Sequence, residues 1–215
     1  MAELVPALFH EMFGDPVRND EGWRTATLAE ACTKITDGTH FSPPTVAHGT
    51  PYVTAKHLNK YGLDFERDPS YISDEHHREI FARCDPRLGD VLYIKDGATT
   101  GQAAVNRYGF EFSMLSSLAL LRPDRNVCDS EYLNAWLNDE SVKLMMMAQM
   151  AGSAIRRLTL EKIKRSHILL PPIGKQSEFA ALEKKIRQVQ DEQTTSRFEL
   201  QGLFESQLNV LMGVA

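Results

Sequence analysis

Several short motifs contain residue types that carry out catalysis in other proteins, and each lacks a necessary member. The glycine-rich stretch 97–101 has neither the Gly-Lys-Ser/Thr of a nucleotide-phosphate loop nor the GxGxxG of a dinucleotide-binding turn. The acid that a metal-dependent nuclease carries two residues before its lysine is replaced by Tyr93 ahead of Lys95, so ligands for two-metal cleavage are missing. His76 and His77 belong to no HExxH pattern, and we expect them to be solvated on a charged helix. The sequence therefore predicts no catalytic site, no metal site and no cofactor.

The second chemical feature is an uneven distribution of charge. The chain has 215 residues, of which 25% are charged and 42% hydrophobic, and its formal net charge is −5. Residues 151–175 nevertheless hold six basic side chains against the single acid Glu161. Such a segment is either a phosphate-binding face or an ordinary solvated helix surface. The basic residues are Arg156, Arg157, Lys162, Lys164, Arg165 and Lys175.

Cysteine content and hydropathy indicate an intracellular globular chain. Cys32, Cys84 and Cys128 are odd in number and form no CxxC pair, so neither a disulfide framework nor a zinc ribbon is expected. The longest apolar stretches, 118–121 and 168–173, are too short to cross a bilayer. The N-terminus lacks the basic start of a signal peptide. We therefore expect a cytoplasmic protein.

The central part of the chain alternates short strands and short helices, without the regular spacing of a doubly wound sheet. We expect a mixed α/β (α+β) domain. Asp129, Thr159 and either Ser73 or Asp74 are suitable helix N-caps, and the methionine-rich segment 145–150 is more typical of core than of a binding surface. The predicted helices are 4–13, a short helix ending at 82, 130–138, 140–151 and 160–165, and the predicted strands are 51–58, 89–95, 102–106, 111–114, 118–122 and 167–170.

The last forty residues predict one long helix, because no proline follows Pro172. At 1.5 Å per residue, this helix would be roughly 60 Å long, which is more than the rest of the chain can cover. It is either a coiled-coil helix awaiting a partner or an amphipathic helix folded back on its own domain. A heptad seam with two polar positions near its middle favours the coiled coil. The seam is Phe179, Leu182, Ile186, Val189, Gln193, Ser196, Leu200, Leu203, Gln207 and Val210.

An ordered set of motifs resembles the target-recognition domain of type I restriction-modification specificity subunits. Its first three parts are Ile35-Thr36-Asp37-Gly38-Thr39-His40 with Pro43, then 51–57, then 88–101. The loop 152–158, the exit 168–173 and the helix start 176–179 resemble the passage from such a domain into the family's spacer helix. Together these parts cover most of the chain in the family's order, and any one of them alone would be weak.

The resemblance implies a non-catalytic subunit that reads one half of a split DNA target and scaffolds methyltransferase and restriction subunits. It implies an N-terminal helical segment and turn over 1–22, a recognition domain over 23–173 and a spacer helix over 174–215. A full-length family member has two such domains and two spacer helices, and this chain has one of each. It is therefore either a half-subunit, which would pair its helix with a second copy or with another recognition half, or the second half of a longer protein. The implied DNA-binding residues are Thr39, His40, Thr54, Lys56, His57, Lys95, Thr99, Thr100, Ser153, Arg156 and Arg157.

Two other classes of function fit the same sequence. The chain could be the recognition region of a single-chain restriction-methylation enzyme, which would place a catalytic portion upstream. It could also be a coiled-coil module that binds protein through its globular part, which predicts no salt-dependent affinity for duplex DNA. The sequence leaves both alternatives open.

Overall fold

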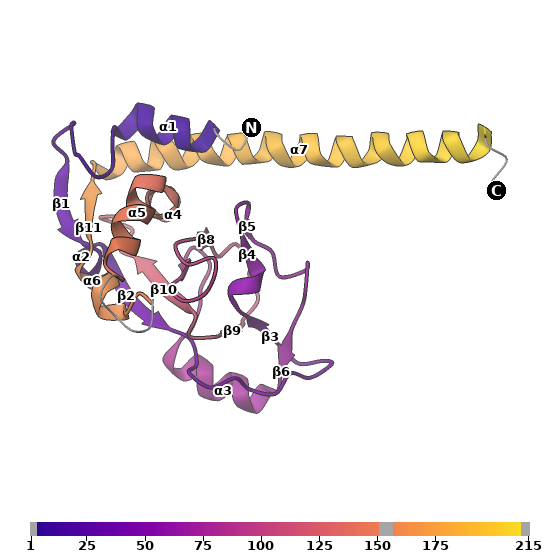
Figure 1. Ribbon diagram of the computed structural model, residues 1–215, viewed down its shortest axis with the longest axis horizontal. Helices are drawn as coiled ribbons and strands as arrows, with labels where there is room; N and C mark the ends of the chain where they lie inside the picture. The colour runs from indigo at the N-terminus through magenta and orange to yellow at the C-terminus, as the bar shows by residue number, and fades with distance from the viewer. Residues whose placement is uncertain (1–3, 151–156, 212–215) are drawn as a thin grey trace.

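A four-stranded antiparallel sheet forms the centre of the molecule, and its strand order is β2-β10-β7-β8 (Figure 1). The strands are β2 (Cys32–Asp37), β10 (Leu118–Pro123), β7 (Val91–Ile94) and β8 (Ala103–Val105). This computed structural model describes residues 4–150 and 157–211. Successive residues of a strand point to opposite faces, and here both faces are buried in hydrophobic core. This explains the continuous apolar runs of β7 and β10.

The first face of the sheet is covered by helices. Val91, Tyr93, Ala119 and Leu121 point into a core shared with α4 (Ser130–Asn138), α5 (Glu140–Ala148), α2 (Leu28–Ala31) and α6 (Leu160–Arg165). The expected caps are confirmed, since Asp129 and Thr159 accept hydrogen bonds from the first backbone N–H groups of α4 and α6. β1 (Arg24–Thr27) pairs with β11 (His167–Leu170) beside these helices.

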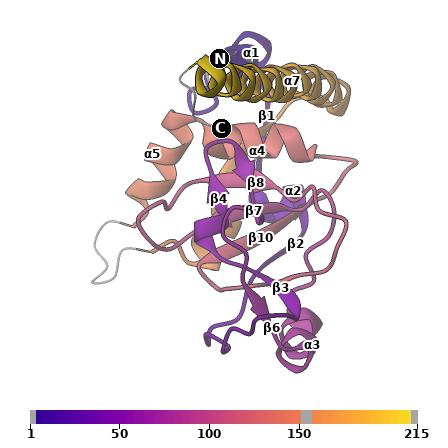
Figure 2. The ribbon, with the colours of Figure 1, turned by 90° about the vertical axis from the view of Figure 1, so that its right-hand side faces the viewer.

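The second face is covered by short strands and a fifth helix. β3 (Thr50–Val53) pairs with β6 (Tyr71–Ile72) on one side and, in parallel, with β9 (Ser113–Met114) on the other. A 3-10 turn, η1 (Ala55–His57), leads from β3 into the hairpin of β4 (Leu58–Asn59) and β5 (Gly62–Leu63). α3 (Asp74–Arg83) lies beside β3 and β6, on the side of the molecule opposite α7 (Figure 2).

The helices α1 (Leu4–Phe13) and α7 (Ile173–Leu211) lie side by side above α4 (Figures 1 and 2). An aromatic cluster joins the three helices. Phe179 of α7 contacts Phe9 and Phe13 of α1, and Tyr132 of α4 stacks against Phe9 and meets Phe13 edge-on. Phe179 is completely buried, as an a position of the predicted seam should be. α1 therefore fixes the first turns of α7 to the domain.

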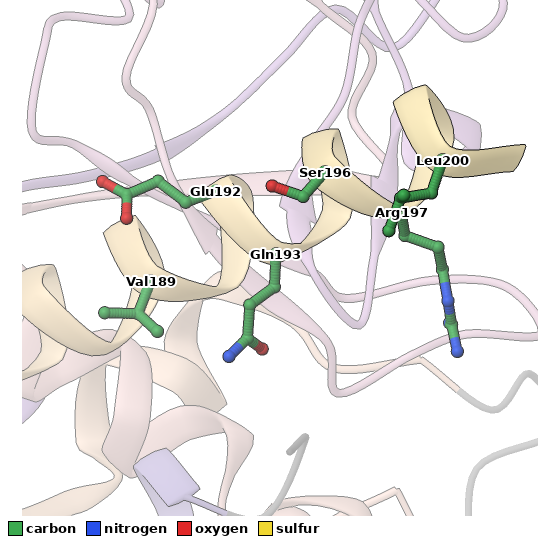
Figure 3. A pocket seen from close by; sticks show the side chains of 6 residues that line it. All are labelled: Val189, Glu192, Gln193, Ser196, Arg197 and Leu200. Atoms are coloured by element: carbon green, nitrogen blue, oxygen red, sulfur yellow. The ribbon is translucent and has the colours of Figure 1, made fainter. Parts of the chain in front are cut away.

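The rest of α7 projects beyond the domain (Figure 1). Three apolar side chains along it, Val189, Leu200 and Phe204, are about half or more exposed. Figure 3 shows side chains between Val189 and Leu200 around an open hollow that is lined by α7 alone, so it is a feature of an unpaired helix surface rather than a ligand pocket. Within the described ranges, no helix is long and apolar enough to span a membrane.

The predicted mixed α/β class is confirmed, and most element boundaries agree within a few residues. The long helix begins earlier than predicted, at Ile173. The strand predicted over 51–58 ends at Val53, because the chain turns into η1. The histidine prediction was wrong for His77, whose side chain is only 12% exposed and whose Nδ1 lies 3.0 Å from Ser113 Oγ. The three cysteines are buried free thiols.

Candidate functional site

Antiparallel pairing brings several predicted site residues to one end of the central sheet. The carboxyl ends of β2 and β7 lie beside the amino ends of β10 and β8, because neighbouring strands run in opposite directions. We call this the loop end of the sheet, defined by Asp37, Ile94, Ala103 and Leu118. The opposite end, defined by Cys32, Val91, Val105 and Pro123, is the helix end. In Figure 1, β2 points towards α3 and away from α7, so the loop end is remote from the long helix.

Residues 114–117 join the separate loops at the loop end. The Thr39 N–H donates to the Met114 carbonyl at 2.8 Å, and the Ser116 N–H donates to the Thr39 carbonyl at 2.8 Å. The Leu115 N–H donates to the carbonyl of Val53, the residue before Thr54, at 3.1 Å. Gly38 is required here, since a Cβ atom at this position would lie 1.9 Å from the Met114 carbonyl oxygen. Two motifs far apart in sequence, 35–40 and 51–57, are thereby held together through residues 114–117, and the Lys95 N–H, which donates to the Ser117 carbonyl at 2.9 Å, joins the third motif to them.

Lys95 lies inside the loop end and is only 5% exposed. Its Nζ lies 2.8 Å from Asp96 Oδ2 and 3.5 Å from Asp37 Oδ2. Its backbone N–H donates to the Ser117 carbonyl, and its own carbonyl accepts a hydrogen bond from the Leu158 N–H. The family resemblance implied that Lys95 binds DNA, but its ammonium group is enclosed and is neutralised by two carboxylates of the protein.

Arg83 is a member of the loop end that sequence reasoning missed. Its Nη1 lies 3.2 Å from Asp37 Oδ1, and its Nη2 donates to the Gly38 carbonyl. The Arg83 side chain is nevertheless half exposed, and so is well placed to meet a ligand. The available signal was a basic residue at the end of a predicted helix, where it also complements the helix dipole. His40, which was predicted, is exposed with its Nε2 3.4 Å from the same Asp37 carboxylate.

The glycine-rich loop 97–101 projects from the same end. Gly97 and Gly101 have φ values of 109° and 100°. Residues other than glycine rarely adopt such values, so the two glycines allow the tight turn. Thr100 is partly used by the turn, because its hydroxyl donates to the Gly97 carbonyl at 2.7 Å, whereas Thr99 is exposed. Arg157 is exposed beside Leu158, which contacts Lys95. Ser153 and Arg156, also predicted, lie outside the described residues.

Thr54, Lys56 and His57 are mainly occupied within the protein. The Thr54 N–H donates to His57 Nδ1 at 2.9 Å, so His57 Nε2 carries the proton and donates to the Asp68 carbonyl at 2.9 Å. Burial lowers the pKa of His57, which keeps the ring neutral and structural. Lys56 Nζ lies 2.9 Å from Asp68 Oδ2 on the surface. These three residues shape the turn after β3, and no ring nitrogen of His57 remains for a ligand.

The basic residues of 151–175 do not form a single face. Arg165 pairs with Glu161, and Lys162 donates to the Gln149 carbonyl at the end of α5. Lys175 belongs to the first turn of α7, and its ammonium group lies over the ring of Trp23. The strand β11 lies between α6 and α7, so Lys175 is separated from the basic residues of α6. Arg157 lies beside the loop end, because the N–H of its neighbour Leu158 donates to the Lys95 carbonyl.

At the helix end, charged residues bind α7 to the domain. Arg107, which follows β8, lies 2.9 Å from Glu131 of α4 and 3.5 Å from Glu183 of α7. Arg187 of α7 lies 3.0 Å from Glu183 and 3.9 Å from Glu131. Burial and the neighbouring Glu131 carboxylate raise the pKa of Glu183 to about 7. The two glutamates and the two arginines thus form a group of ion pairs that is partly shielded from solvent.

The part of the chain that the structure describes contains no group of three or more His, Cys, Asp or Glu side chains able to hold a metal ion. A serine–histidine–glutamate series, Ser113, His77 and Glu111, has its hydroxyl on a completely buried residue. A substrate has no access to that hydroxyl, so the arrangement is structural. The loop end instead offers hydrogen-bonding and positively charged groups on loops that a rigid base positions.

Comparison with solved structures identifies the architecture. The HsdS subunit from Thermoanaerobacter tengcongensis aligns with 86% of this chain at a TM-score of 0.58 and 23% identity. A chain from a structure concerned with complex assembly and conformational transition of the type I R-M system aligns with 97%, at a TM-score of 0.60 and 24% identity. The fold is that of a type I restriction-modification S subunit.

The type I restriction-modification S subunit from M. genitalium shares this fold at 14% identity, with 90% of this chain aligned and a TM-score of 0.58. The present chain spans 42%, 48% and 50% of the three solved chains, and so corresponds to about half an S subunit. No protein-family model matches the sequence, and no curated protein matches it significantly. The resemblance inferred from sequence motifs is thus supported by the fold.

Proposed function

We propose that this chain recognises a specific sequence in double-stranded DNA as a specificity subunit of a type I restriction-modification system. The observation that carries the proposal is the convergence of three loops on the loop end of a domain with the S-subunit fold. The exposed side chains there include His40, Arg83, Thr99 and Arg157. We assign them to the DNA interface, with the domain spanning 23–173.

The chemistry of these four side chains suits both components of DNA recognition. Arginine pairs with phosphate oxygens or, in a bidentate manner, with a guanine edge. Threonine and histidine are short donors and acceptors that suit base edges. The base contacts would come from loops, and the buried backbone bonds beneath them would set their positions. The chain has no catalytic role in this proposal.

The proposal includes a partner for α7 and, through the assembled subunit, methyltransferase and restriction subunits. In this proposal, 1–22 is the N-terminal segment that carries α1, which holds the first turns of α7 against the domain, and the remainder of 174–215 pairs with a second recognition half. The exposed apolar residues Val189, Leu200 and Phe204 support such pairing, because an unpaired helix gains by burying them. Pairing with a second copy would give a homodimer that reads a symmetric, split target.

A binding measurement with the full chain tests the DNA interface. Fluorescence anisotropy of labelled duplexes, followed by selection from a random duplex library, should show salt-dependent binding and enrichment of a short motif. Arg157→Ala should reduce the slope of log affinity against log salt by about 1. Arg87→Ala removes an exposed arginine near the helix end, where it pairs with Asp85, and should leave the slope unchanged. Absence of salt-dependent binding would favour a protein-interaction module instead.

A further inference from the structure

We infer that Lys95 is the residue that positions the DNA-reading loops and sets sequence discrimination without contacting DNA itself. The inference rests on the proposed function and adds a role that the exposed residues do not have. Its basis is that the Lys95 ammonium lies between Asp37, at the end of β2, and Asp96, at the start of the loop 96–101. One buried cation thus connects two of the converging loops.

The contacts around Asp37 extend this connection to side chains on the surface. Oδ1 of Asp37 lies 3.2 Å from Arg83 Nη1 and 3.4 Å from His40 Nε2, while Oδ2 faces Lys95. The orientation of Arg83 and His40 is therefore set by a carboxylate that Lys95 holds in place. Asp37 is almost fully buried, so little water is available to replace a lost partner.

The backbone of Lys95 has a separate role from its side chain. The N–H and carbonyl groups bond to Ser117 and Leu158, and these bonds remain whatever side chain is present at position 95. Replacing the ammonium group leaves the sheet register intact but places two carboxylates together without a shared cation. Asp96 should then move towards solvent and take the loop 96–101 with it.

This geometry separates the effect of Lys95 from that of a phosphate contact. The Lys95 charge is already neutralised inside the protein, so its loss releases no counterions from DNA and leaves the salt slope unchanged. Displaced loops would instead lose contacts to base edges. These contacts are what lowers the affinity of a specific protein for a site with a mismatched base pair, so their loss brings the affinities for correct and wrong duplexes closer together. We expect the ratio of affinities for selected and scrambled duplexes to fall at least tenfold.

The test compares Lys95→Met with the parent full chain, using the duplex selected by the parent and a scrambled duplex. A tenfold or larger fall in the affinity ratio with an unchanged salt slope is the expected result. An unchanged ratio would refute the positioning role while leaving the proposed DNA recognition intact. A slope reduced by about 1 with the ratio preserved would show that Lys95 contacts phosphate.

Two further variants separate positioning from folding. Lys34→Met removes a lysine of β2 that lies 2.6 Å from Asp85 at the helix end, and it should leave the affinity ratio unchanged. Lys95→Met with Asp96→Asn removes one charge of each sign, so it should fold even if the single variant does not, and should still lose discrimination. If neither Lys95 variant folds, or if Lys34→Met loses discrimination equally, Lys95 has only a structural role and the inference fails.

Discussion

The two ends of the central sheet use similar ion pairs for different purposes. At the helix end, Arg107 and Glu131 meet Glu183 and Arg187, and their charges are satisfied within the domain and α7. At the loop end, a buried lysine is satisfied by two aspartates, while Arg83 and His40 remain exposed beside them.

The difference between the ends lies in what the ion pairs connect. At the helix end, they join two residues of the domain to two residues of α7 and so fix a long helix to the domain. The loop end keeps one cation inside as a support and leaves others on the surface. A domain built in this way can change its loops without disturbing the helix, because the sheet separates the two sets of contacts.

The largest effect of breaking the helix end should come from Phe179→Ala. Phe179 is completely buried among Phe9, Phe13 and the helices around them, so its removal leaves a cavity between α1, α4 and α7. We expect a loss of about 3–5 kcal/mol in the free energy of unfolding, measured by chemical denaturation. Phe204→Ala, on the exposed part of the same helix, should change it by less than about 0.5 kcal/mol at concentrations where α7 is unpaired. Equal losses would contradict the arrangement of α7.

A smaller effect should appear in the pH dependence of stability. The pKa of Glu183 is raised from 4.5 to about 7, so the folded state binds its proton more tightly than the unfolded chain does. The free energy of unfolding should therefore fall as the pH rises from about 4.5 to 7. Glu183→Gln should flatten this decline and, after allowance for solvent screening and for the lost Arg187 pair, add roughly 1 kcal/mol at pH 8.

Denaturation midpoints between pH 5 and 8 measure this effect. Glu178→Gln provides the control, since Glu178 is an exposed glutamate on the same helix and its replacement should retain the parent profile. A Glu183→Gln variant with the full decline of the parent chain would show that Glu183 has no special role at the helix end.

Helix and strand boundaries were predicted well where they depend on residues close by in the sequence. The helix α4 begins after Asp129 and α6 after Thr159 as predicted, because an N-cap acts on backbone groups two or three residues away. The start of α7 was predicted less accurately. Its first turn follows Pro172, whose carbonyl accepts hydrogen bonds from Lys175 and Gln176, and the sequence pattern placed the helix start three residues later.

The candidate site was harder to predict, because its contacts join residues far apart in the chain. Arg83 meets Asp37 across more than forty residues, and no local pattern indicates that contact. Lys95 follows a strand buried on both faces, so the alternation of polar and apolar residues that usually shows orientation is absent. His57 closes the turn after β3 with its ring, and its sequence context resembles that of an exposed loop residue.

Amide hydrogen exchange of the full chain, with and without the selected duplex, tests most directly where DNA binds. We predict slower exchange on binding at 38–42 and 96–101, with no change at 106–108 or over the first turns of α7. Protection confined to α7 and the helix end, with the loop end unaffected, would contradict the account.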